Sequence, residues 1–125
     1  MTPEREAPES AAEGVLAALA DPTRRQILDL LSRHGSGTAT SLAAELPVSR
    51  QAVVKHLGIL DRAGLIEGQR VGREMRYSVR PGRLDETARW LASLASDWDR
   101  RLHAVKRLAE SVPQRSTASA PLSEP

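Results

Sequence analysis

The sequence predicts a mainly α-helical fold with one small β-hairpin, and three observations lead to this prediction. Apolar residues recur at helical spacing along most of the chain, whereas alternation of apolar and polar residues is confined to residues 74–80. The four residues Val71-Gly72-Arg73-Glu74 fit a two-residue hairpin turn with glycine in the first central position. A length of 125 residues suits one domain with a modest core.

Start and stop signals place the first two helices. Residues 1–9 are polar and proline-containing and are expected to be disordered, and a short helix is expected over residues 10–20. Asp21 at the N-cap and Pro22 at the first helical position then begin a helix that should end near residue 34. The expected apolar sides are Val15, Leu16 and Leu19 in the first helix, and Ile27, Leu28, Leu30 and Leu31 in the second.

A tight turn joins the next two helices. Thr38 or Thr40 caps a short helix, which Pro47 ends because the residue before a proline is pushed out of the α region. Only Pro47 and Val48 then precede Ser49, which is a favourable N-cap for a helix over residues 49–62. Two short helices joined so closely predict a helix-turn-helix.

The helix over residues 49–62 has two different sides. Its core side includes His56, which we expect to be packed and hydrogen-bonded rather than catalytic or metal-binding. The opposite side is mostly polar and basic near its start. The core side carries Ala52, Val53, His56, Leu57, Ile59 and Leu60, and the outward side carries Arg50, Gln51, Val54, Lys55, Gly58, Asp61 and Arg62.

The second half of the chain is expected to form a hairpin and a long helix. Gly64 ends the preceding helix, and Pro81-Gly82 ends the hairpin. A helix over residues 83–111 has a heptad stripe too long and too apolar for so small a domain to cover, so we expect it to pair with a second copy. Residues 112–125 are expected to be disordered. The expected dimer interface consists of Val15, Leu16, Leu19, Leu84, Leu91, Leu94, Trp98, Leu102 and Val105.

This order of elements over residues 10–111 is that of a winged helix-turn-helix with a long C-terminal dimerisation helix. Its charge is uneven: residues 49–83 contain eight Lys/Arg and three Asp/Glu, a net of 8 − 3 = +5, against 1 − 4 = −3 for residues 1–14. A basic middle segment indicates a polyanionic partner, with a solvated charged face as the alternative. Together with the helix-turn-helix it favours double-stranded DNA as the partner.

Nine residues of this segment have expected roles in contacting DNA. Arg50 and Gln51 are placed to contact base edges, because Arg bridges guanine O6 and N7 and Gln bridges adenine N6 and N7. Phosphate contact alone fits Arg50 nearly as well, and Val54 is either a thymine-methyl contact or a stray exposed valine. Phosphate contacts are expected from Ser49, Lys55 and Arg62, and phosphate or minor-groove contacts from Arg70, Arg73 and Arg76 of the hairpin.

Three segments together resemble the ArsR/SmtB-type transcriptional regulators. They are the run from Ala17 to Leu28 (AALADPTRRQIL), the run from Ser49 to Leu57 (SRQAVVKHL) and Ala63-Gly-Leu-Ile66, and the likeness covers about residues 13–108. The resemblance implies a homodimer that represses transcription from a palindromic operator and an effector that releases it.

The chain departs from the metal-sensing members of that family. It contains no cysteine, and Ala43-Ala44-Glu45 occupies the region where such members often have a Cys-Val-Cys pair. On the last helix the available ligands are Asp97, Asp99, His103 and Glu110, which would be a poor zinc or nickel site. We therefore expect no metal and no cofactor, and the chemical class of any small-molecule effector stays open.

Other functions fit the sequence less well. No nucleophile or phosphate-loop motif is present, so an enzyme is not expected. No apolar run approaches the length of a membrane span, so we expect a cytoplasmic protein without membrane contact. The alternatives are a winged-helix module for protein–protein contact, and a DNA-binding protein or activator without a ligand. Trp90 and Trp98 either pack or line an effector pocket.

Overall fold

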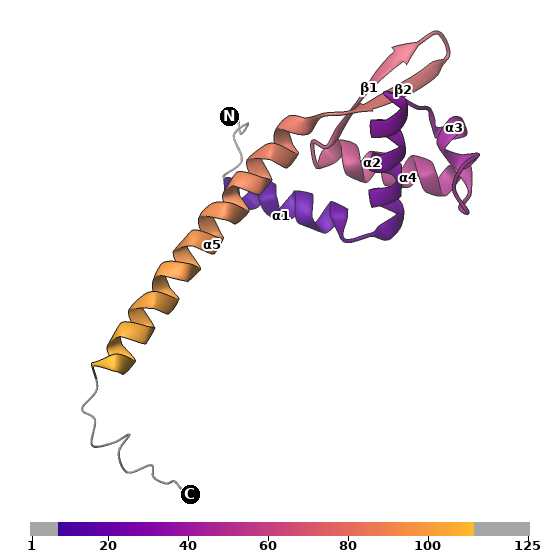
Figure 1. Ribbon diagram of the computed structural model, residues 1–125. Coiled ribbons are helices and arrows are strands. Elements are labelled where there is room, and N and C mark those ends of the chain that lie inside the picture. Colours follow the sequence, from indigo (N-terminus) through magenta and orange to yellow (C-terminus); the bar gives the residue numbers. More distant parts are fainter. Residues whose placement is uncertain (1–7, 112–125) are drawn as a thin grey trace, which may run out of the picture. The chain divides into compact units, whose positions relative to one another are not determined.

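The computed structural model describes residues 8–111, and its elements follow the predicted order. The elements are α1 (Pro8–Leu19), α2 (Pro22–His34), α3 (Ala39–Ala43), α4 (Arg50–Arg62), β1 (Ile66–Val71), β2 (Glu74–Val79) and α5 (Pro81–Glu110) (Figure 1). The predicted mainly helical fold with a hairpin and a long last helix is confirmed. The expected disorder of residues 1–9 and 112–125 lies outside the described residues, except that α1 already includes residues 8 and 9.

Capping side chains begin α2, α3 and α4. The Asp21 carboxylate accepts the Arg24 N–H at 3.0 Å, and the Ser49 hydroxyl accepts the Ala52 N–H at 3.1 Å, as predicted. At α3 the cap is Thr38 rather than Thr40. Thr38 and Ser41 form a capping box, in which each side chain accepts the other residue's main-chain N–H, at 3.0 and 2.9 Å.

Gly64 turns the chain at the end of α4. Its φ of +80° is in the left-handed region, which glycine adopts without a steric penalty. The Gly64 N–H donates to the Asp61 carbonyl and the Leu65 N–H to the Leu60 carbonyl, both at 3.0 Å, which is the Schellman pattern. The expected glycine stop is confirmed.

One hydrophobic core joins α1 to α4 and the start of the hairpin. Apolar side chains at the predicted helical spacing fill it, and Leu28, Tyr77, Val79 and Leu84 pack against its edge. Its buried members are Val15, Ala18, Ile27, Leu30, Leu31, Ala39, Leu42, Val53, Leu57, Leu60, Leu65 and Ile66.

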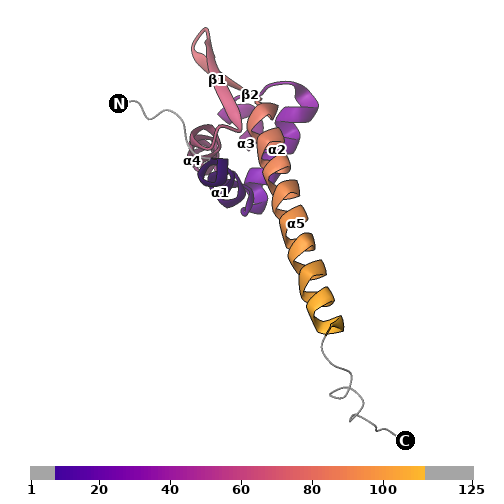
Figure 2. The ribbon, with the colours of Figure 1, turned by 90° about the vertical axis from the view of Figure 1, so that its left-hand side faces the viewer.

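The hairpin pairs β1 with β2 in antiparallel register from Ile66 opposite Val79 to Val71 opposite Glu74. Gly72 has φ +64°, and no non-glycine residue in the described range has positive φ, so the turn matches the predicted type with glycine first. Figure 1 and Figure 2 show this ribbon extending beyond the helices of its unit. The alternation of apolar and polar residues over 74–80 predicts alternating buried and exposed side chains. This prediction is wrong near the tip, where Met75 is exposed.

The last helix begins at Pro81, two residues before its expected start, because proline fits the first helical position. Of the described residues, those from 8 to 90 form one compact unit with α1 to β2, and those from 91 to 111 belong to a second unit. In the first unit, Leu84 packs on the core and Thr87 is buried. No helix within residues 8–111 is long and apolar enough to cross a membrane.

Candidate nucleic-acid interface

The helix α4 separates a buried side from an exposed polar side, as its periodicity predicts. Val53, Leu57 and Leu60 are almost completely buried in the core. The short helix α3 packs against α4 (Figure 1), so the two form the expected helix-turn-helix. The exposed side begins at Ser49 and comprises Ser49, Arg50, Gln51, Val54, Lys55, Asp61 and Arg62.

The exposed residues of α4 differ in how firmly they are held. The Arg50 Nε donates to the Thr40 hydroxyl at 3.1 Å, which fixes its side chain against α3. Among residues 8–111, the side chains of Gln51 and Lys55 have no hydrogen-bond or ion-pair partner. Arg62 extends back along the helix, since its Nη1 lies 3.6 Å from where a Cβ on Gly58 would be. Gln51, Lys55 and Arg62 are therefore the amide and basic side chains of this face that have no polar partner within the described residues.

The β1–β2 hairpin is the wing of the fold, and its three expected DNA-contacting arginines lie in different environments. Arg70 and Arg73 are exposed at the tip, as expected. Arg76 is half-buried: its Nη1 donates to the Ser36 hydroxyl at 3.0 Å, and its Nη2 lies 3.8 Å from the Glu74 carboxylate. Arg76 is therefore held beside the α2–α3 connection, where Ser36 lies, and is less available for a DNA contact than Arg70 and Arg73.

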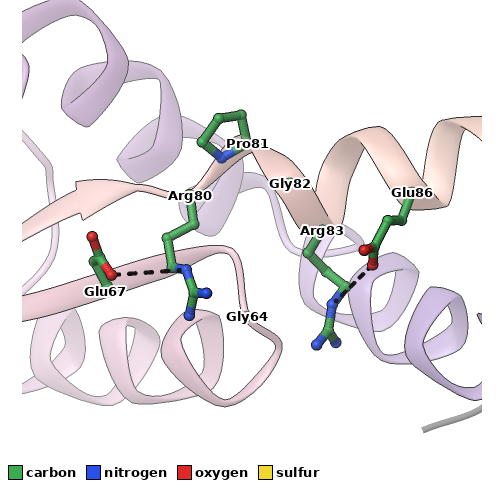
Figure 3. A pocket seen from close by; sticks show the side chains of 7 residues that line it. All are labelled: Gly64, Glu67, Arg80, Pro81, Gly82, Arg83 and Glu86. Carbon is green, nitrogen blue, oxygen red and sulfur yellow. Dashed lines mark ion pairs between the residues drawn. The ribbon is translucent and has the colours of Figure 1, made fainter. Parts of the chain in front are cut away.

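A polar hollow lies where the end of α4, the base of the hairpin and the start of α5 meet (Figure 3). Arg80 pairs with Glu67 at 3.8 Å, and Arg83 pairs with Glu86 at 3.6 Å. Two of the eight basic residues in the basic segment therefore have their charges balanced by these carboxylates. No local sequence pattern predicts this hollow, because its seven lining residues come from β1, α5 and the connections that precede them: Gly64, Glu67, Arg80, Pro81, Gly82, Arg83 and Glu86.

His56 lies on the inner side of α4 and is hydrogen-bonded. The prediction that this side chain is packed and hydrogen-bonded is confirmed. Its Nδ1 is 3.2 Å from Nη1 of Arg24 and 4.0 Å from a carboxylate oxygen of Asp21. From the sequence, Asp21 is expected only to cap α2, and Arg24 has no expected role. Arg24 precedes His56 by 32 residues, and no local pattern connects them.

The acidic residues of α5 are mostly engaged with neighbours on the same helix. Asp97 pairs with Arg100, and His103 lies 3.6 Å from the Asp99 carboxylate. Within the described part of the chain, no three His, Cys, Asp or Glu side chains gather as a metal site would require. Glu110 does not join the Asp99–His103 pair.

The apolar residues expected at a dimer interface fall into two groups. Val15 is completely buried in the core of its own chain, and Leu19 and Leu84 pack against that core. The assignment of Val15 to an interface with a second copy is corrected, because its side chain is already covered. Leu19 and Leu84 are only partly buried, so their place at such an interface stays a prediction. The exposed members are Leu16, Leu91, Leu94, Trp98, Leu102 and Val105, to which the structure adds Leu108.

Known proteins share this arrangement. A family model described as a helix-turn-helix domain matches residues 19–69. The chain is 35% identical over 85 residues to the transcriptional repressor SdpR of Bacillus subtilis, covering 68% of this chain and 93% of that protein. It is 43% identical over 83 residues to the HTH-type transcriptional regulator Rv2034 of Mycobacterium tuberculosis, covering 66% and 70%. An ArsR-like transcriptional regulator from Rhodococcus sp. RHA1 has a TM-score of 0.75 and 48% identity, covering 83% of this chain and 97% of that one.

Proposed function

We propose that this chain, which belongs to the ArsR/SmtB family of winged helix-turn-helix transcriptional regulators, is a homodimer that represses transcription from an inverted-repeat operator. Membership of the family makes it a DNA-binding transcriptional regulator. The dimer, the symmetry of the operator and the repression are the parts that we propose.

The observation that carries the proposal is the exposed side of α4. Gln51 and Lys55 extend from it without partners in the described chain, beside Arg50, which α3 holds in place. In our proposal Arg50 and Gln51 contact base edges in the major groove, and Val54 contacts a thymine methyl. Phosphate contacts come from Ser49, Lys55 and Arg62 of the helix and from Arg70 and Arg73 of the wing.

The dimer rests on the exposed apolar side of the second half of α5. Trp98 is 53% exposed, and Leu102 and Val105 are 64% and 61% exposed, which is unusual for large apolar side chains at heptad spacing. Pairing this stripe with a second copy, together with Leu16, removes it from water. In such a dimer the two α4 helices are expected about 34 Å apart, so the half-sites are one turn apart.

The proposed effector is not a metal ion. No cysteine is present, and the last helix offers one histidine among carboxylates, of which Asp97 is paired with Arg100. Zinc and nickel favour imidazole and thiolate ligands over such a set. The effector, where one acts, is expected to be a small molecule of another class.

Selection of genomic DNA fragments by the purified full-length protein tests this function. We expect enrichment of an inverted repeat at a promoter, equally with and without a chelator, and reduced transcription from that promoter when the protein is added. Enrichment that appears only with the chelator would contradict our proposal that the effector is not a metal ion. Binding without sequence preference would contradict the operator, and no binding would favour the protein-interaction module.

A further inference from the structure

Arg24 connects three helices through a single side chain. Its Nε donates to the Ala18 carbonyl at 2.7 Å and its Nη2 to the Ala17 carbonyl at 3.4 Å, so it satisfies the end of α1. Its Nη1 lies 3.2 Å from Nδ1 of His56 in the middle of α4. Its own main-chain N–H is held by Asp21 at the start of α2.

The chemistry of this contact determines the protonation state of His56. A guanidinium has only donors and keeps its charge, so Nδ1 of His56 must accept the hydrogen bond. The imidazole is therefore neutral and carries its proton on Nε2. Protonation of Nδ1 would place two N–H groups and two positive charges opposite each other.

A second partner for a protonated His56 is already in place. Asp21 lies 4.0 Å from Nδ1, and a hydrogen bond would need this distance to shorten by about 1 Å. These two residues are the charged groups that face the imidazole. The neighbours of His56 one turn away on α4 are the apolar Ala52, Val53, Ile59 and Leu60. Within residues 8–111, α3 and β1 place no charged group within hydrogen-bond or ion-pair distance of it.

We propose that Arg24 is a positioning residue for DNA binding, which holds α4 through neutral His56 and releases it when His56 is protonated. Protonation exchanges Arg24 for Asp21 as the partner of His56 and shifts the helix that carries Gln51 and Lys55. This inference rests on the proposed DNA-binding function and adds pH regulation to it. It also couples α4 to the end of α1, whose Leu16 belongs to the proposed dimer surface.

The direction of the pH effect distinguishes this mechanism from simple electrostatic attraction between a protonated histidine and DNA. An added positive charge on a DNA-binding protein ordinarily strengthens its attraction to phosphates. Release of α4 instead weakens specific binding as the pH falls. We expect the dissociation constant for the selected operator to rise about tenfold between about pH 8 and about pH 5.5, within the range typical of coupled equilibria.

Fluorescence anisotropy with a labelled operator duplex measures this effect. His56→Asn keeps an acceptor near the position of Nδ1 but does not titrate, so its affinity should be the same at both pH values. Arg24→Lys keeps the positive charge but loses the separate N–H groups that contact α1 and His56 at the same time. This variant should bind the operator weakly at both pH values, with an unchanged dimer mass. His34→Gln and His103→Asn are matched controls, and both should keep the wild-type pH dependence.

Wild-type affinity that is constant or increases on acidification would overturn the inference, as would an unchanged pH profile in His56→Asn. Long-range ¹H–¹⁵N spectra of the free protein give a readout that needs no DNA. They should show the Nε2–H tautomer of His56 at high pH, and an Nδ1–H tautomer would overturn the inference. If the wild type binds no duplex at any pH, the proposed function fails, and these spectra alone decide the Arg24–His56 contact.

Discussion

Gly37 and Tyr77 exchange two main-chain hydrogen bonds across 40 residues of sequence. The Tyr77 N–H donates to the Gly37 carbonyl at 2.8 Å, and the Gly37 N–H donates to the Tyr77 carbonyl at 3.0 Å. An isolated two-stranded hairpin is marginally stable in water, so this bridge attaches the wing to the connection between α2 and α3. The direction of the wing relative to the helix-turn-helix depends on it.

Gly37→Ala should destabilise the fold by about 1–3 kcal/mol through crowding. The φ of Gly37 is not positive, so alanine can adopt the backbone conformation. An added Cβ, however, would lie 3.0 Å from Leu31 Cδ2 and 3.3 Å from the Ser41 hydroxyl. Urea denaturation of both proteins measures the difference. Gly58→Ala is the control: its Cβ meets only Arg62 at 3.6 Å, so it should stabilise α4 by about 0.5–1 kcal/mol.

Arg73→Ala and Arg76→Ala should separate DNA contact from structural support in the wing. Arg73 is exposed at the turn, so its removal should lower the salt dependence of operator binding by about one unit without changing stability. Arg76 bonds to Ser36, so its removal should cost about 1 kcal/mol of unfolding free energy. Salt titrations and urea denaturation of the two variants measure both quantities. Equal stability losses would contradict the distinction.

Lys55→Ala should weaken binding to all duplex sequences and lower the slope of log K against log salt by about one unit. Gln51→Ala should instead change the preferred base at one position in each half-site, at a cost of about 1–3 kcal/mol in discrimination. Arg89→Ala is a control, since Arg89 is an exposed arginine already paired with Asp85 on α5. An unchanged slope for Lys55→Ala would place the DNA elsewhere than on α4.

Leu102→Glu should convert the proposed dimer to a monomer at micromolar concentration. Leu102 is 64% exposed in the single chain, so the fold of the protomer should tolerate the charge, whereas a paired apolar stripe should not. Sedimentation velocity measures the mass. Ser93→Glu introduces the same charge about 140° around the helix from Trp98, and this control should remain dimeric. A dimeric Leu102→Glu protein would contradict the interface.

Asp21→Asn should remove one acid-sensitive contribution to stability. The pKa of Asp21 is lowered from its ordinary 3.8, first by the N–H bond from Arg24 and then by the positive charges of His56, once it is protonated, and of Arg24, while burial opposes these effects. A lowered folded pKa means that the stabilisation is present above pH 3.8 and is lost as the pH falls through the folded value. Unfolding free energies of both proteins from neutral pH to below 3.8 should therefore converge at the acid end. A constant difference would contradict a charged cap.

Local signals in the sequence determined where the helices begin and end. Asp21 and Ser49 cap helices with bonds to the residue three positions ahead. Gly64 turns the chain, with its own N–H bonded three positions back and the N–H of Leu65 bonded five positions back. Such interactions depend only on near neighbours, so the sequence alone predicts them. The two sides of α4 follow equally from its period of 3.6 residues, which is why the DNA-facing candidates were identified.

Contacts between distant segments were decided by the tertiary structure. The same apolar pattern places Val15 in the core of its own chain and leaves Leu102 exposed, and helical periodicity cannot say which partner covers a residue. The Arg24–His56 contact, the Gly37–Tyr77 bridge and the bond from Arg76 to Ser36 join residues 32 to 40 positions apart. These pairings exist because packing of the core brings the elements together, and that packing depends on all of the elements at once.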